Sequence, residues 1–249
     1  MVLRAFFSLE HYLRRMDELT HAADDRITRR GSLVRAGGFL AALLVPGGWR
    51  AETAGAGPAG VASAAVTCVL TPEQTEGPYY IPNERVRRNI TEGRPGTSLA
   101  LRAKVVDAST CKPLEGAAVD IWHCDAAGIY SGFGQGAGNR TFMRGIQRTD
   151  ATGLAVFQTV YPGWYPGRTV HIHVKVHLGG NVVHTGQLYF PDSVTDSAYQ
   201  KAPYRSRPGR DVRNASDAVF RNGGRSSLLS LRRSGAGYVA SIAMGVQRA

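Results

Sequence analysis

Two histidines spaced two residues apart are the clearest candidates for chemistry in this sequence. His171 and His173 lie in the segment GWYPGRTVHIHVKVH, residues 163–177. On a β-strand, residues i and i+2 face the same side about 7 Å apart, so both imidazoles can reach one metal ion. An H-x-H pattern alone is a weak signal, because two unrelated polar positions on a strand look the same.

Tyrosines near this pair narrow the choice of metal. Tyr165 lies in a Pro-Gly-rich turn six residues before His171, with Arg168 between them, and Tyr130 follows a glycine turn. Zinc prefers thiolate, imidazole and carboxylate ligands, whereas a phenolate is a hard anionic donor that suits Fe(III). The alternative for Tyr165 is an aromatic side chain that simply packs in its loop. Two tyrosines with two histidines favour non-haem Fe(III).

Short strands must position these residues. The 30 glycines and 12 prolines among 249 residues favour a turn-rich β protein. Apolar residues alternate with period two over residues 99–106, 117–123, 154–160, 169–178, 182–190, 226–232 and 237–244. These strands predict an all-β fold: an antiparallel, immunoglobulin-like β-sandwich with long loops that carry the metal site. On the H-x-H strand, Lys175 predicts that the histidine face opens to solvent beyond His173.

The first 65 residues predict an N-terminal extension and export signal that is removed. Arg29 and Arg30 precede an apolar stretch at 37–45, and A-x-A cleavage patterns follow at 54–56 and 62–64. This order is typical of a bacterial twin-arginine signal, with a Sec signal as the alternative. Either route gives an exported protein, periplasmic or extracellular. Residues 66–249 are then one mature domain with no integral membrane segment, since no apolar run reaches about 18 residues.

Three cysteines follow the leader. In an oxidising compartment two of them pair, and we expect Cys68 with Cys111, because both lie in loops beside proline-containing turns. Cys124 lies in a denser motif and is expected to be a small buried side chain.

The net charge of +11 does not indicate a nucleic-acid partner. Only four of the 30 basic residues are lysine, and the arginines are scattered along the chain rather than clustered. No helix-turn-helix, zinc-finger or RNA-binding motif is present.

Ordered motifs along the chain resemble the intradiol ring-cleavage dioxygenases, the family of protocatechuate 3,4-dioxygenase and catechol 1,2-dioxygenase. The resemblance runs from about residue 68 to 245. The motifs that carry it are TPEQTEGPYY at 71–80, PLEGAAVDIW at 113–122, GIY at 128–130, YPGR at 165–168, HIH at 171–173 and QLYF at 187–190.

This resemblance implies a metal site, an activity and partners. It implies a non-haem Fe(III) enzyme that inserts O2 into a catechol-type ring to give a muconate-type dicarboxylic acid. Its partners are a small catechol-type substrate and O2, and a homo-oligomer stays open. The implied metal ligands are Tyr130, Tyr165, His171 and His173. The implied catalytic residues are Arg168, Tyr165 and Gln187, and those that bind substrate are Tyr79, Tyr80, Arg168 and Gln187.

Two alternatives stay open. One is a non-catalytic, exported β-sandwich binding module that retains the fold. The other is a copper or zinc sandwich resembling superoxide dismutase, which would need further ligands from His123, His177 or His184. His123 is expected to be a hydrogen-bonded strand residue, and Asn214 and Asp217 a turn or helix cap that shapes a surface loop.

Overall fold

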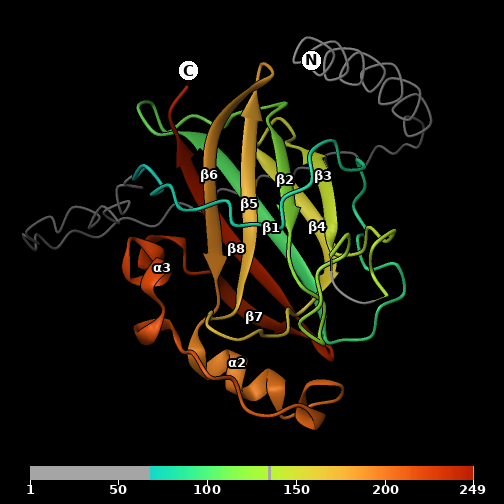
Figure 1. The fold of residues 1–249 in the computed structure, drawn as a ribbon. Helices are drawn as coiled ribbons and strands as arrows, with labels where there is room; N and C mark the ends of the chain where they lie inside the picture. Colours follow the sequence, from blue (N-terminus) through green and yellow to red (C-terminus); the bar gives the residue numbers. More distant parts are fainter. Residues whose placement is uncertain (1–67, 134–135, 249) are drawn as a thin grey trace, which may run out of the picture. The chain divides into compact units, whose positions relative to one another are not determined.

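Alternating apolar residues pack the strands of this chain into two facing sheets (Figure 1). The computed structural model describes residues 68–133 and 136–248. Strand β1, Ser98–Asp107, shows the pattern: Leu99, Leu101 and Ala103 are buried, and the residues between them are more exposed. Such alternation is expected of a strand with one face on a core.

Each sheet has four strands. The first has the order β4-β1-β8-β7, and the second has the order β3-β2-β5-β6. The remaining bounds are β2 Ala118–Trp122, β3 Arg144–Arg148, β4 Leu154–Val160, β5 His171–Leu178, β6 Asn181–Tyr189, β7 Ser230–Ser234 and β8 Gly237–Val246. The predicted all-β sandwich is confirmed.

Three details differ from the sequence prediction. Strand β8 runs parallel to β1, so the first sheet is mixed rather than purely antiparallel. Strand β3 was not expected, because its polar sequence RGIQR has no apolar alternation. The strand predicted at 226–232 begins only at Ser230, because Gly224–Ser227 forms a 3-10 turn instead.

Strand β5 is buried on both faces. Ile172, Val174 and Val176 point into the core between the sheets, and His171, His173 and Lys175 lie on the other face. That outer face is covered by the N-terminal strap, which we define as residues 68–81 and which crosses in front of β5 and β6 (Figure 1). Lys175 therefore pairs with Glu76 of the strap and is buried, and the prediction that this face opens to solvent was wrong.

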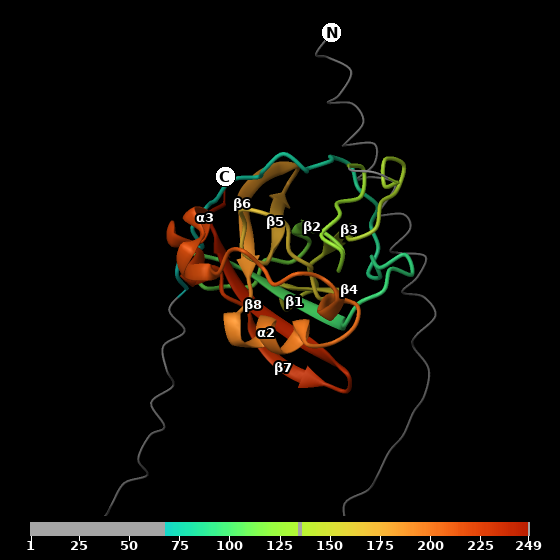
Figure 2. The same cartoon turned by 60° about the horizontal axis from the view of Figure 1, so that its bottom comes forward.

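A helical segment lies at the end of the sandwich where β6 ends and β5 begins (Figures 1 and 2). It contains α2 Asp192–Tyr199, η1 Tyr204–Ser206, η2 Asn214–Ser216, α3 Ala218–Arg221 and η3 Gly224–Ser227. Within the described ranges, none of the helices has the length and apolar character needed to cross a bilayer.

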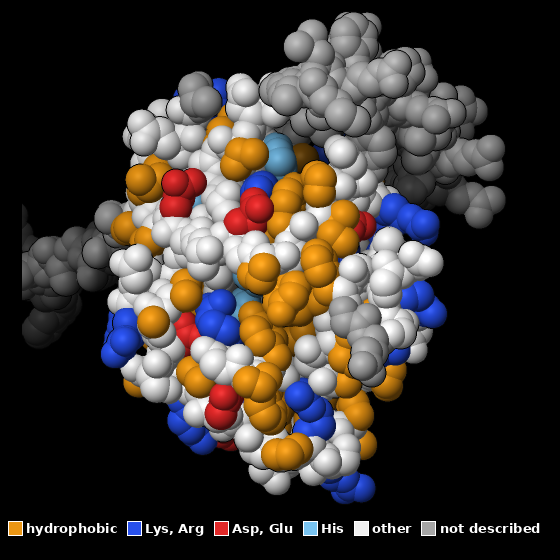
Figure 3. Space-filling model, viewed as in Figure 1, with side chains coloured by type: hydrophobic (Ala, Val, Ile, Leu, Met, Phe, Trp, Pro, Cys, Tyr) orange, Lys and Arg blue, Asp and Glu red, His pale blue; other side chains and the backbone are white. Residues whose placement is uncertain are grey.

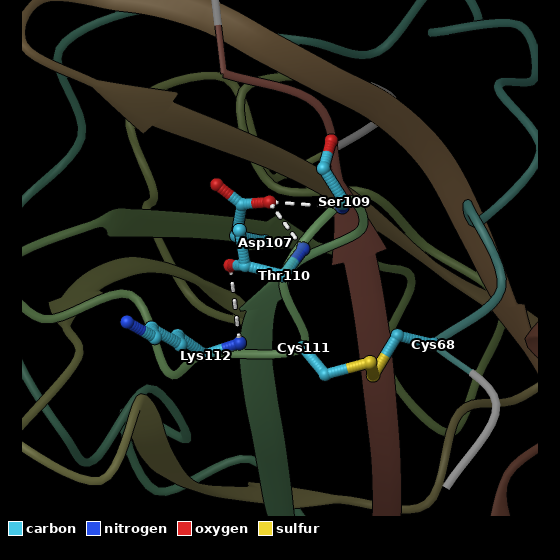
Figure 4. Close-up of a disulfide and its surroundings, with 6 residues drawn as sticks. All are labelled: Cys68, Asp107, Ser109, Thr110, Cys111 and Lys112. Carbon is cyan, nitrogen blue, oxygen red and sulfur yellow. Dashed lines mark hydrogen bonds between the residues drawn. A yellow bond between two sulfur atoms is a disulfide. The ribbon is translucent and has the colours of Figure 1, made fainter.

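A disulfide fastens the start of the strap to the first sheet. Cys68 and Cys111 are bonded, with their Cα atoms 5.4 Å apart (Figure 4). The turn that presents Cys111 is held by Asp107, whose carboxylate accepts hydrogen bonds from the backbone N–H groups of Ser109 and Thr110. The chain then pairs with β8, because the Thr71 N–H donates to the Gly245 carbonyl over 2.9 Å. Cys124 is a free buried thiol, as expected.

The predicted leader, residues 1–65, lies outside the described residues. The described residues from Cys68 onward belong to one structural unit.

Candidate functional site

Strand β5 brings the two histidines together on the outer face of the second sheet. Both imidazoles are buried, and their Nε2 atoms lie 3.1 Å apart. Trp122 of the neighbouring strand β2 stacks on the His173 ring, with centroids 4.9 Å apart and planes 5° apart. The two nitrogens are therefore close enough to ligate one ion, and the indole fixes one of the rings.

Two tyrosines complete a group of four donors. The Tyr165 hydroxyl lies 3.0 Å from the His171 Nε2 atom. The Tyr130 ring lies 5.6 Å from the Tyr165 ring and 6.1 Å from the His173 ring, measured between centroids. Tyr130 is buried, yet its hydroxyl has no hydrogen-bond partner among the described residues. A buried polar atom without a partner is rare in folded proteins and points to a group that satisfies it.

A glycine turn positions Tyr130. Asp125 holds this turn, since its carboxylate accepts hydrogen bonds from the N–H groups of Ala127 and Ile129. Gly128 has φ +83°, and a Cβ atom there would lie 2.3 Å from the Trp164 carbonyl oxygen. Only glycine fits this conformation and this approach. The Tyr130 loop consequently packs directly on the turn that carries Tyr165.

Burial keeps all four donors uncharged in the protein by itself. It lowers the pKa of His171 to about 3, helped by the Arg168 charge, and lowers the pKa of His173 well below its ordinary value. It raises the pKa of Tyr165 to about 12 and that of Tyr130 well above its ordinary value. The imidazoles are therefore neutral and available as ligands, and the phenols need a strong nearby cation to ionise.

The backbone selects the tautomer of His171. Its Nδ1–H donates to the Thr169 carbonyl over 2.6 Å, which leaves the Nε2 lone pair facing Tyr165 and His173. Fixing one imidazole nitrogen by a backbone carbonyl is a common way to orient a metal-binding histidine. Four donors of this kind fit Fe(III), a hard trivalent ion that accepts phenolate and imidazole together.

Arg168 and Gln187 lie beside the donors and contact each other. The Arg168 Nη2 atom donates to the Gln187 Oε1 atom over 2.6 Å, and the Arg168 Nε atom donates to the Asp217 carboxylate over 2.9 Å. Gln187 is buried and donates to the Thr75 carbonyl of the strap. Its Oε1 atom also accepts from the Tyr189 hydroxyl over 3.1 Å.

The strap forms one wall of the site. Tyr79 stacks on Tyr130 with ring centroids 4.3 Å apart, whereas Tyr80 lies against Trp122 and Lys175 and contacts none of the four donors in this way. Gly77 has φ +73°, and a Cβ atom there would come within 3.1 Å of the His173 ring. The strap thus approaches the second histidine as closely as its backbone allows.

Arg144 of β3 ties this wall to the Tyr130 loop. Its guanidinium is almost fully buried and donates to the Tyr79 carbonyl over 2.7 Å and to Ser131 beside Tyr130. Aromatic side chains line the donors in a cluster that includes Phe133. Figure 3 shows hydrophobic side chains gathered in a band across this face of the molecule.

The other histidines that the structure describes are not part of this group. His123 is buried, and its ring nitrogens bond to the Cys124 carbonyl and the Thr159 hydroxyl, as expected for a structural residue. Across residues 68–133 and 136–248, no three His, Cys, Asp or Glu side chains gather where they could hold a metal ion. The copper or zinc alternative therefore has no ligand set in that part of the chain.

Asp217 was expected in a surface loop, and the structure corrects this. It does cap α3, because its carboxylate accepts from the Phe220 N–H over 2.8 Å. However, it is only 1% exposed and also binds Arg168 and the Thr169 N–H. Asn214 is buried as well and binds the Thr169 hydroxyl. An N-x-x-D sequence predicts a turn, but it carries no signal that the turn faces a site far away in sequence.

Comparisons with known proteins agree on one group. The family model described as dioxygenase matches residues 75–200. An intradiol ring-cleavage dioxygenase from Tetranychus urticae is 37% identical, covers 72% of this chain and 95% of its own, and superposes with a TM-score of 0.70. The dioxygenase domain of a dioxygenase–carbohydrate-binding protein fusion from Streptomyces sp. SirexAA-E is 35% identical, covering 73% of this chain and all of its own, with a TM-score of 0.58.

Among curated proteins, catechol 1,2-dioxygenase from Candida albicans is 30% identical over 149 residues, which is 49% of each chain. The chain spans about half the length of the first curated relatives it matches, or less.

Proposed function

The chain belongs to the intradiol ring-cleavage dioxygenase family, and from that premise we propose that it is a non-haem Fe(III) enzyme acting on a catechol. Both atoms of O2 enter the ring, the bond between the two hydroxyl-bearing carbons breaks, and a muconate-type dicarboxylic acid forms without a separate reductant. The observation that carries the proposal is the convergence of Tyr165, His171 and His173 beside the unpartnered hydroxyl of Tyr130.

Those four side chains would hold the ion. Bound there, Fe(III) would act as a Lewis acid that ionises the two phenols and both hydroxyls of the catechol. Tyr130 is the more buried phenol and has the fixed position, since it is stacked under Tyr79.

Tyr165 is suited to move a proton. It is half-buried, and its hydroxyl already lies 3.0 Å from the His171 Nε2 atom. Because burial raises the pKa of Tyr165 to about 12, its phenolate, once released by the ion, would readily take a proton at the Oη atom from an incoming catechol hydroxyl.

Arg168 supplies a fixed positive charge on the same side of the site. Its guanidinium is oriented by Gln187 and Asp217. An arginine held in place before the reaction stabilises negative charge on the catechol ring without having to reorganise.

A visible spectrum with iron and zinc quantified on the same sample tests this proposal. Tyrosinate bound to Fe(III) gives a charge-transfer band, so we expect a coloured protein with one iron per chain and a band that shifts when catechol is added. We expect His173→Ala to lose iron and colour. The control is His177→Ala, which removes a half-buried histidine from the far end of the same strand and should keep both.

A wild-type protein that stays colourless after Fe(III) reconstitution contradicts the metal site. The protein would then be better described as a binding module on the same fold.

We propose in addition that the protein is exported. The disulfide between Cys68 and Cys111 supports this, since such bonds persist in oxidising compartments.

A further inference from the structure

Asp217 connects the helical segment to the candidate site. Its side chain has no exposed surface, and its carboxylate meets three donors from two segments. One carboxylate oxygen accepts from the Arg168 Nε atom over 2.9 Å and from the Thr169 N–H over 2.8 Å. The other accepts from the Phe220 N–H at the start of α3.

The contact with Asp217 fixes the direction of the Arg168 guanidinium. A guanidinium is planar, and its Nε and Nη2 atoms here bond to two different partners, Asp217 and Gln187. Two hydrogen bonds from one planar group prevent the guanidinium from rotating. The bond to the buried Asp217 carboxylate is charge-assisted and therefore stronger than the bond to the neutral Gln187 amide. Without Asp217, the guanidinium would keep the bond to Gln187 but lose the other of these two bonds.

The same carboxylate also holds the backbone next to a donor histidine. It binds the N–H of Thr169, and the carbonyl of Thr169 accepts from the Nδ1–H of His171 over 2.6 Å. Asn214 of the same turn binds the Thr169 hydroxyl over 2.7 Å. The turn therefore holds residues 168 and 169 at the point where β5 begins.

We propose that Asp217 is a positioning residue of this enzyme: it holds the Arg168 guanidinium in the orientation in which it stabilises charge on the substrate ring. This inference rests on the proposed function. Asp217 bonds to none of the four donor side chains: it bonds directly to Arg168, and its bond to the Thr169 N–H reaches His171 only through the backbone.

Asp217→Asn is the variant that tests this role. Asparagine has the same shape but is neutral and has one acceptor oxygen instead of two. Placed toward Arg168 and Thr169, which share one carboxylate oxygen, that oxygen gives Arg168 a neutral partner in place of a charged one; placed toward Phe220, it leaves the Arg168 Nε atom and the Thr169 N–H facing the NH2 group. We expect kcat with catechol to fall about 100-fold, as when a catalytic group is misplaced by about 1 Å. Iron content and the charge-transfer band should stay as in the wild type, because the four donors are intact.

A second readout does not depend on turnover. Binding of 4-nitrocatechol to the iron-loaded protein is followed by absorbance, and we expect its dissociation constant to rise about tenfold in Asp217→Asn through the lost orientation of the Arg168 charge. The matched control is Asp196→Asn, which removes another arginine-paired carboxylate of the helical segment and should change neither quantity.

A double-mutant cycle separates positioning from a structural role. If Asp217 acts through Arg168, then Asp217→Asn costs little further activity in an Arg168→Ala background. If the two losses multiply instead, Asp217 acts on the fold and the inference is wrong. Should Asp217→Asn fail to fold, Arg168→Lys tests the same orientation. Lysine keeps the positive charge but has no planar guanidinium whose separate nitrogens fix its direction between Asp217 and Gln187. Wild-type kcat in that variant would overturn the inference.

The outcomes for the inference and for the function are distinct. Iron-loaded wild-type protein without catechol turnover contradicts the proposed function. In that case the affinity for 4-nitrocatechol alone tests whether Asp217 positions Arg168. Active wild-type protein with unchanged kcat and analogue affinity in Asp217→Asn contradicts only the positioning role.

Discussion

Tyr130 and Tyr165 share a residue type but not an environment, and the difference separates their tasks. Tyr130 is buried under Tyr79, whereas Tyr165 is half-buried at a turn and its hydroxyl contacts His171. A donor that must stay in place belongs in the first environment. A donor that exchanges with substrate belongs in the second, where less packing opposes its movement.

We expect Tyr165→Phe to retain iron but to lower kcat with catechol by about 100-fold or more, because it removes the proton acceptor. The charge-transfer band should weaken rather than vanish, since Tyr130 remains. The control is Tyr238→Phe, which removes a buried hydroxyl that has no hydrogen-bond partner among the described residues and lies in the other sheet. Wild-type turnover in Tyr165→Phe would contradict the assigned role.

Asp120 predicts a dependence of stability on pH. Its carboxyl group is buried beside Tyr80, Glu84, Lys175 and Arg144, and burial raises its pKa to about 8. The folded state therefore holds a proton that the unfolded state has released above about pH 4. The protonated Asp120 carboxyl group therefore makes its full contribution to the free energy of unfolding below about pH 4. This contribution is lost as the pH rises through 8.

The Asp120→Asn variant has no proton to lose at this position. Its free energy of unfolding, relative to that of the wild type, should therefore increase as the pH rises from 5 to 9. Urea unfolding at each pH measures this difference. Asp150 is the control, because hydrogen bonds in an exposed turn lower its pKa. Asp150→Asn should therefore show no such gain, and a constant difference for Asp120→Asn would rule out a raised pKa in the folded state.

Three of the four candidate donors could be predicted from local spacing and residue type, and Tyr130 from the glycine turn before it and the family resemblance. The H-x-H pair and the Y-P-G-R turn lie within nine residues of one another, from 165 to 173. Asp217 could not be predicted in the same way. Its role depends on the helical segment folding back to the start of β5, and no local pattern shows that contact.

At the scale of elements, the strap depends on its anchors. It begins at the disulfide, pairs with β8, bonds Gln187 through Thr75 and ends against Tyr130 through Tyr79. One covalent bond at its start therefore restrains an element that forms a wall of the site.

We expect Cys68→Ser to lower the free energy of unfolding by about 4 kcal/mol, from the loop entropy of a 43-residue separation. Chemical denaturation measures this loss. Dithiothreitol should reproduce it in the wild type and have no further effect on the variant. If Cys68→Ser is as stable as the wild type, the disulfide does not restrain the unfolded chain as proposed.

Strand positions were predictable where apolar residues alternate, and three features were not. Strand β3 has a polar sequence, and it is placed by pairing with β2 rather than by its own pattern. The parallel direction of β8 follows from strand order, which alternation does not encode. The burial of Lys175 follows from the strap, whose path over β5 depends on Glu76 and on contacts remote in sequence.

At the scale of the whole molecule, the prediction concerns the route out of the cell. Arg29 and Arg30 lie outside the described residues, so only the amino-acid sequence supports this route. We expect Arg29→Lys with Arg30→Lys to leave the unprocessed protein in the cytoplasm, as measured by cell fractionation and N-terminal sequencing of the mature form. Single substitutions serve as the graded control. Unchanged export in the double variant would favour a Sec signal, which needs only a basic region.

The position of β8 bears on how the protein is made. β8 is the last strand of the described chain, yet it lies between β1 and β7, and Leu99 of β1 pairs with Tyr238. During synthesis, β1 is made long before β8. Until β8 is made, the backbone N–H and C=O groups on that edge of β1 lack their hydrogen-bond partners. Pairing this distant in sequence makes folding slow and leaves the waiting strand open to association with other chains. The edge of β1 that β8 covers therefore stays open until β8 has been made.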